Sequence, residues 1–218
     1  TKCTCSLAIL LALTSGLTGC AEKPTENLSE TDLQKDSLVE DQNDEPANSS
    51  PQEDQASLPP YLPINPDTVA ENNAGDFTYE EYDNGESIAI TGYTGTSAQV
   101  KIPSQIDGKE VVCISEEAFR GNDIVTYVYI PDSVVQLEKS IFLNCSNLEE
   151  VRIPPVSKIP YGFMAKCTSL KYLEIPEGCE AIGEGDGTGS FSECKSLTDV
   201  KFPSTLQYIH ANSFSECS

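Results

Sequence analysis

Apolar and polar positions alternate in a short unit that recurs through the second half of the chain. Each unit has two apolar residues around a variable residue and ends in proline. In an extended strand this alternation points both apolar side chains to one face and the variable side chain to the other. Proline after the strand ends the hydrogen-bond ladder, because it has no donor. Five copies are present, with prolines 28, 23, 22 and 27 residues apart: residues 100–103, 128–131, 151–154, 173–176 and 200–203.

A second set of apolar positions lies between these units and keeps their phase. One short strand cannot bury its own apolar face, but stacked copies form a parallel sheet with a continuous core. The segments 115–119 and 138–142 predict helical or 3₁₀ turns on the side opposite the strands. The aromatic column is Phe119, Phe142, Met164, Phe191 and Phe214, and three residues after each come Asn122, Cys145, Cys167, Cys194 and Cys217.

The unit resembles the BspA-type leucine-rich repeat, through Glu117-Ala118-Phe119, Asp132-Ser133-Val134 and the recurring Ile-Pro. The resemblance covers about residues 77–218. It implies an α/β-type repeat solenoid, leucine-rich-repeat-like, with a parallel sheet of short strands and short helical or 3₁₀ turns on the opposite side. Residues 76–99 are expected to form an N-terminal cap, followed by about five repeats over 100–218. The array stops in mid-repeat, so we expect it to be truncated at the C-terminus.

The first 19 residues have the pattern of a secretory signal: Lys2, an apolar run over 7–13, and small residues after it. The run is too short to span a bilayer. Residues 17–20, Leu-Thr-Gly-Cys, resemble the lipobox of bacterial lipoproteins, which implies a signal peptide over 1–19 and lipidation of Cys20. The alternative is an ordinary signal peptide with a chance cysteine. Because the chain begins with Thr1 and not Met, the signal is expected to lack its first residues.

Residues 20–75 are expected to form a lipidated, acidic and disordered tether. The segment is rich in Glu, Asp, Asn, Gln, Ser and Pro and has no aromatic residue before Tyr61. Such a composition buries too little apolar surface to offset its chain entropy, and like charges keep it extended. A spacer is preferred over an acidic interaction tail. Residues 59–63, Pro-Pro-Tyr-Leu-Pro, allow a small docking motif, but a stiff linker is the preferred interpretation.

Charge and residue types argue against several classes of function. The formal net charge of -22 repels nucleic acid at long range, so no nucleic-acid partner is expected. The six repeat cysteines are interpreted as buried hydrophobes in preference to disulfides, and their spacing with one histidine predicts no metal site or cofactor. The insertion at 183–190 is interpreted as a flexible loop in preference to a calcium site. No catalytic residues are predicted, and the chain is not expected to be an enzyme.

The variable strand positions form an outward sheet face. Tyrosines and an arginine among mixed charges are typical of an interaction surface. The alternative is a solvated sheet with ordinary cross-strand pairs, such as Arg152 with Glu174. The candidate binding residues are Lys101, Tyr127, Tyr129, Arg152, Tyr172, Glu174 and Lys201.

Proteins with these repeats are often surface adhesins, so the resemblance implies an extracellular protein or glycan partner, on host matrix or other bacterial cells. The chain is then expected on the outer side of a bacterial cell membrane, held through the lipid on Cys20. Two alternatives remain open. The repeats are the recognition arm or spacer of a larger surface enzyme, or the protein is a structural envelope component without an external ligand.

Overall fold

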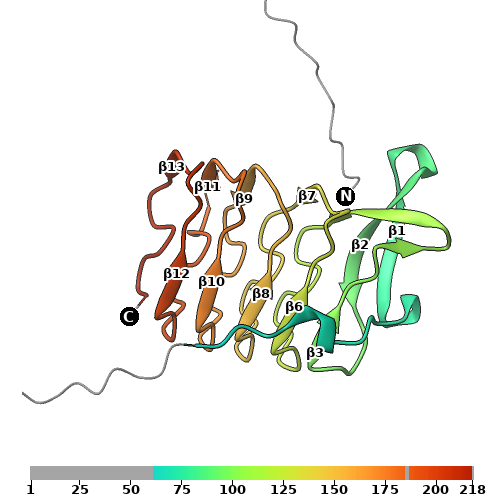
Figure 1. Cartoon of the computed structure of the whole chain (residues 1–218), viewed down its shortest axis with the longest axis horizontal. Helices are drawn as coiled ribbons and strands as arrows, with labels where there is room; N and C mark the ends of the chain where they lie inside the picture. The colour runs from blue at the N-terminus through green and yellow to red at the C-terminus, as the bar shows by residue number, and fades with distance from the viewer. Residues whose placement is uncertain (1–60, 185–186, 218) are drawn as a thin grey trace, which may run out of the picture. The chain divides into compact units, whose positions relative to one another are not determined.

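The computed structural model describes residues 61–184 and 187–217 (Figure 1). These residues belong to one compact unit. The expected signal peptide, the lipidated Cys20 and the tether as far as residue 60 lie outside the described residues. Among the described residues, no helix is long and apolar enough to cross a membrane.

One row of short parallel strands carries the recurring apolar–variable–apolar unit (Figure 1). Strands β3 (Gln99–Lys101), β6 (Tyr127–Tyr129) and β8 (Glu150–Arg152) form one parallel sheet, with Val100 opposite Val128 and Val128 opposite Val151. Strands β10 (Tyr172–Glu174) and β12 (Asp199–Lys201) pair in the same register. The central residue of β3, β6, β8 and β10 is buried. The predicted parallel sheet and its inward face are confirmed.

A second row of strands was not predicted. Strand β9 (Lys158–Pro160) pairs in parallel with β11 (Ala181–Glu184), which pairs in parallel with β13 (Tyr208–Ile209). Strand β7 (Gln136–Leu137) pairs in parallel with β5 (Lys109–Ile114). Buried residues such as Ile159 and Ile182 line up on neighbouring coils of this row. Each coil therefore has two extended segments facing a shared core.

The helical or 3₁₀ turns expected opposite the strands are not confirmed, and the described residues contain no α-helix. The residue before each Asn or Cys of the repeat has a left-handed backbone, with φ of 68° at Gly121, 63° at Asn144 and 64° at Lys166. Continued helix needs negative φ at every residue, so this position ends it after a single turn. The backbone instead bonds to the next coil: Phe119 N–H donates to the Ile141 carbonyl, and Phe142 N–H to the Phe163 carbonyl, both at 2.9 Å.

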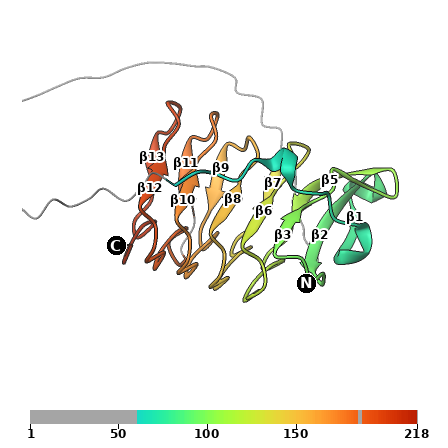
Figure 2. The ribbon, with the colours of Figure 1, turned by 60° about the horizontal axis from the view of Figure 1, so that its bottom comes forward.

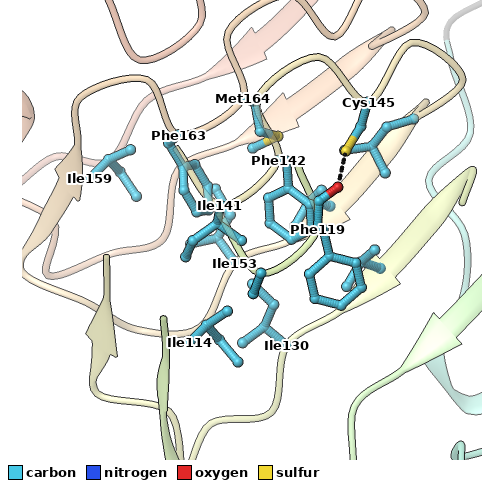
Figure 3. Packing of buried hydrophobic residues seen from close by; sticks show 14 of the residues in the cluster. Ile114, Phe119, Ile130, Ile141, Phe142, Cys145, Ile153, Ile159, Phe163 and Met164 are labelled. Carbon is cyan, nitrogen blue, oxygen red and sulfur yellow. Dashed lines mark hydrogen bonds between the residues drawn. The ribbon is translucent and has the colours of Figure 1, made fainter. Parts of the chain in front are cut away.

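The aromatic column fills the middle of the coils (Figure 3). Phe119 and Phe142 have ring centroids 5.1 Å apart. In the third coil the backbone places Met164 in the aromatic register, as predicted, because its N–H donates to the Ser190 carbonyl as Phe142 N–H donates to Phe163. The ring contacts pass instead through Phe163, whose centroid lies 5.5 Å from Phe142 and 6.4 Å from Phe191.

The cysteines after the aromatic column are buried, as predicted, except for the half-buried Cys217. Each thiol donates to a backbone carbonyl of the preceding coil: Cys145 to Phe119 at 2.9 Å, Cys167 to Phe142 at 3.1 Å, Cys194 to Met164 at 3.2 Å and Cys217 to Phe191 at 3.2 Å. Figure 3 shows the first of these contacts. A small side chain thus fills core space and satisfies a carbonyl at the turn.

The N-terminal cap is an antiparallel hairpin. Strand β1 (Phe77–Tyr82) pairs with β2 (Ser87–Tyr93) across the short 3₁₀ turn η3 (Asp83–Gly85). Strand β2 then pairs in parallel with β5 (Lys109–Ile114), and β5 also pairs antiparallel with β4 (Gln105–Ile106). The tilted Phe77 and Tyr93 rings, 5.4 Å apart, extend the aromatic column into the cap. This closes the apolar end of the solenoid.

Residues 61–72, called the strap below, lie on the sheet face (Figure 2). The strap includes the 3₁₀ turn η1 (Pro66–Thr68), and the turn η2 (Ala74–Asp76) leads from it into β1. The expected disordered tether to residue 75 is therefore corrected over 61–75, where the chain is ordered. The reason is physical: Tyr61 and Ile64 find hydrogen-bond partners on the sheet, and Val69 is buried.

Candidate binding face

Two columns of outward side chains run across the strands. The charged column contains Lys101, Tyr129, Arg152, Glu174 and Lys201, and the tyrosine column contains Gln99, Tyr127, Glu150, Tyr172 and Asp199. Members of the two columns stand two residues apart on each strand and therefore point to the same face.

The charged column is at least partly exposed to solvent and is internally paired. The Tyr129 ring lies between two cations, with Lys101 Nζ 5.3 Å and Arg152 Cζ 5.1 Å from its centroid. Arg152 also forms an ion pair with Asp132, and not with Glu174 as the solvated-sheet interpretation expected. An aromatic ring held between two partly exposed cations is a rigid platform on the sheet face.

The charged column contacts the tyrosine column at Glu174 and Lys201. The Tyr172 hydroxyl donates to Glu174, and Lys201 Nζ lies 3.8 Å from the Glu174 carboxylate and 5.2 Å from the Tyr172 ring centroid. Both charged side chains are exposed, so this ion pair contributes little to stability. The arrangement places one carboxylate and one ammonium on the free surface beside a buried phenol.

The tyrosine column is buried at its centre. Tyr127, Glu150 and Tyr172 are 0%, 4% and 3% exposed, although they belong to the outward face. The strap crosses these strands in both views (Figures 1 and 2). The column therefore has the outward orientation that the alternation predicts, but it is not open to solvent.

Glu150 holds one end of the strap. Its carboxylate accepts a hydrogen bond from the Tyr61 hydroxyl and one from the Ile64 backbone N–H, each at 3.0 Å. The Tyr61 ring stacks on Tyr172 with centroids 5.7 Å apart and planes at 25°. These contacts seat one aromatic side chain and one backbone donor on the tyrosine column.

Asn72 holds the other end of the strap. Its backbone N–H donates to the Lys101 carbonyl, and its side-chain oxygen accepts from Lys101 N–H, both at 3.0 Å. The Lys101 ammonium also donates to the Pro66 carbonyl at 3.3 Å. Asn72 thus satisfies backbone groups of β3, which pairs with only one other strand of its sheet.

Burial shifts the titration of the tyrosine column. Desolvation raises the pKa of the Glu150 carboxyl, and the hydrogen bonds from Ile64 and Tyr61 oppose that effect without cancelling it. Burial, with the nearby Glu150 charge, raises the pKa of Tyr127 to about 12. The Tyr127 hydroxyl has no hydrogen-bond partner among the described residues. A buried polar group without a partner carries a desolvation cost.

A pocket of about 250 Å³ lies between the strap and the strands. Pro63 and Ile64 of the strap form one wall. The strands contribute residues of both columns, namely Glu150, Tyr172, Arg152 and Glu174. The pocket is thus the place where the charged and tyrosine columns are reached together.

The structure places all seven predicted binding residues on one face and divides them into two environments. Lys101, Tyr129, Arg152, Glu174 and Lys201 are at least partly exposed, whereas Tyr127 and Tyr172 are buried. Three residues that shape this face are not among the predicted binding residues: Tyr61, Glu150 and Asn72. A signal for Tyr61 existed, because residues 59–63 allow a small docking motif, although a stiff linker was the preferred interpretation.

The repeat thiols are buried, and the metal-ligating side chains do not cluster in the described parts of the chain. Burial raises the pKa of Cys145 and of Cys194 to about 12, and that of Cys167 well above its ordinary value. These thiols are therefore protonated at neutral pH and poor nucleophiles. No group of three His, Cys, Asp or Glu side chains gathers around a common point within residues 61–184 and 187–217.

Comparison with known proteins identifies the repeats. The family model for the BspA-type leucine-rich repeat region matches residues 94–218 in six copies, where the sequence pattern predicted about five. A search of curated proteins found no match.

Solved structures of leucine-rich repeat proteins are similar to this chain. The protein TpLRR of T. pallidum shares 32% identity over 68% of each chain, with a TM-score of 0.63. A protein from Bacteroides ovatus shares 27% identity over 65% of this chain and 44% of its own, with a TM-score of 0.51.

Proposed function

We propose, from the premise that this chain belongs to the BspA-type leucine-rich repeat family, that it binds another macromolecule through the charged column of its strand face. Membership of a leucine-rich repeat family supports a role in protein–protein binding. The finer proposal is an adhesin-like protein that takes an extracellular protein or glycan, on host matrix or on other bacterial cells.

One observation carries this proposal: the charged column is at least partly exposed, in register within each sheet, and chemically mixed. The parallel register sets Tyr129 beside Arg152 on neighbouring strands. Paired strands lie about 4.8 Å apart, so the hydrogen-bond donors, the acceptors and the Tyr129 ring of the column are held at fixed spacing within each sheet. Tyrosine and arginine on a rigid support are the residue types that dominate binding energy at interfaces.

Attachment to the cell surface is the second part of the proposal, and it rests on residues 17–20 alone. A multi-chain lipid on Cys20 would hold the protein firmly, since each buried methylene contributes about 0.8 kcal/mol. Replacing Cys20 by Ala is expected to move the protein from the detergent phase to the aqueous phase in a phase-partition assay. Retention of the variant in the detergent phase would contradict lipid anchoring at this residue.

The binding proposal is tested by immobilising the full chain and measuring association with matrix proteins, mucins and bacterial cells. The test variant carries Tyr129→Ala, Arg152→Ala and Lys201→Ala. A matched control changes the same residue types away from the face, with Tyr208→Ala, Arg120→Ala and Lys166→Ala, all at exposed positions. Saturable binding that the control keeps and the test variant loses supports the proposal. Equal binding by both variants, or no binding to any panel member, contradicts it.

A further inference from the structure

The strap is held on the sheet by few contacts. Only Val69 is buried among residues 61–72, and Leu62 is 84% exposed. Two anchors, Tyr61 with Ile64 at one end and Asn72 at the other, account for most of its hydrogen bonds to the strands. A segment with little buried apolar surface opens at low free-energy cost.

The surface under Tyr61, formed by Glu150 and Tyr172 and called the seat below, does not fully favour the docked strap. Docking removes the Glu150 carboxylate from water and supplies it with two donors. Burying a carboxylate costs free energy that hydrogen bonds offset only in part. In addition, the Tyr127 hydroxyl is enclosed without a partner among the described residues. The strap therefore occupies a seat that it does not fully satisfy.

The contacts of the strap indicate which kind of ligand the seat would bind. It stacks a phenol ring on Tyr172, accepts the phenol hydroxyl at Glu150, and accepts a backbone N–H three residues further on. Between these two donors the strap side chain of Leu62 points to solvent. The seat thus selects an extended segment through tyrosine at one position and the peptide backbone at another.

We propose that the tyrosine column is a second binding site, for an extended tyrosine-bearing peptide segment of a partner protein, and that the strap is its displaceable internal occupant. The proposal rests on the proposed function, because it uses the same strand face and the same class of partner. It adds the chemistry of the ligand and a device that limits access to it. A partner gains the site by replacing residues 61–64 while Asn72 keeps its place on β3.

The test measures binding of a labelled peptide with the sequence of residues 58–65 to the full chain in trans. Wild-type chain is compared with Tyr61→Ala, which vacates the seat, and with Leu62→Ala, a neighbouring strap change that leaves the seat occupied. Apparent affinity is reduced by the fraction of chains with an open seat. We expect the Tyr61→Ala chain to bind at least about tenfold tighter than wild type, with Leu62→Ala unchanged.

Two further arms identify the seat. Adding Tyr172→Ala to the Tyr61→Ala chain removes the stacking surface and is expected to abolish peptide binding, and a peptide with alanine in place of its tyrosine is expected not to bind. Circular dichroism of each variant verifies that the repeats remain folded. Equal affinity of wild type and Tyr61→Ala, or no saturable binding by either, overturns the proposal. A concentration-dependent dimer in sedimentation would identify a second copy's strap as the occupant and would also overturn it.

The outcome is separable from that of the proposed function. Peptide binding by the vacated seat without any partner in the surface panel supports the site and contradicts the adhesin-like role. Panel binding that depends on Arg152 but is indifferent to Tyr61 and Tyr172 supports the charged column and overturns the peptide site.

Discussion

The charged column and the tyrosine column differ in exposure although they share strands, orientation and register. Tyr129 is partly exposed between two cations, whereas Tyr127, two residues earlier on the same strand, is fully buried. Their neighbours on the sheet do not explain the difference, because both columns lie on the same outward face. The strap crosses these strands (Figure 2). It contacts the tyrosine column at Glu150 and Tyr172 and touches the charged column at Lys101, whereas Tyr129 stays partly exposed. Outward orientation on a solenoid therefore does not by itself make a residue available to a partner.

The largest difference between the columns is expected in stability. Tyr127→Ala removes a fully buried ring and is expected to lower the free energy of unfolding by about 3 kcal/mol. Tyr129→Ala removes a half-exposed ring and is expected to cost less than about 1 kcal/mol. Urea unfolding followed by circular dichroism measures both. Similar losses for the two variants would show that the strap does not distinguish the columns.

Glu150 tests whether the strap is what separates the columns. Glu150→Ala leaves the Tyr61 hydroxyl and the Ile64 N–H without their acceptor, so hydrogen exchange of the Ile64 amide is expected to be about tenfold faster. Glu149→Ala is the matched control, because that neighbouring carboxylate pairs with Lys171 instead. Unchanged Ile64 exchange in Glu150→Ala would mean that other contacts hold the strap.

The Tyr127 hydroxyl tests how tightly the strap closes. Tyr127→Phe deletes a buried hydroxyl without a partner among the described residues and is expected to stabilise the fold by about 1 kcal/mol. Tyr172→Phe serves as control, since that hydroxyl donates to Glu174 and its loss brings no such gain. A destabilised Tyr127→Phe variant in thermal unfolding would indicate that this hydroxyl is bonded in solution.

The smallest expected effect is a pH dependence of strap docking. With the strap docked, the pKa of the Glu150 carboxyl lies above its ordinary value of 4.5, chiefly because of burial. A group with a raised pKa favours the docked state most at pH below its ordinary value, and this contribution is lost as pH rises through the raised pKa. Ile64 amide protection, corrected for intrinsic exchange, is thus expected to fall over that range. Glu150→Gln is expected to flatten the profile, and an unchanged slope in that variant would assign the dependence to another group.

Much of the fold could be predicted from local patterns. Alternation around Val128 and Val151 places their side chains inward in any parallel stacking of the strands, and the spacing of the prolines sets the length of each coil. The column of buried cysteines follows from the same phase. The turns could not be predicted as well, because residues such as Asn144 and Lys166 adopt left-handed backbone that their types permit without requiring. Phe163 entered the ring stack because both it and Met164 point into the core of one coil.

By itself the sequence determined the repeat phase, the inward face and the outward position of every candidate binding residue, because these depend on neighbours a few residues apart. The tertiary structure alone decided which outward residues are covered. Tyr61 and Glu150 are 89 residues apart, and their contact depends on where the chain passes before it enters the cap. A periodic pattern carries no information about such a crossing. The composition predicted a disordered tether, because prolines and acidic residues favour an extended segment. It gave no information on the surface that this segment contacts.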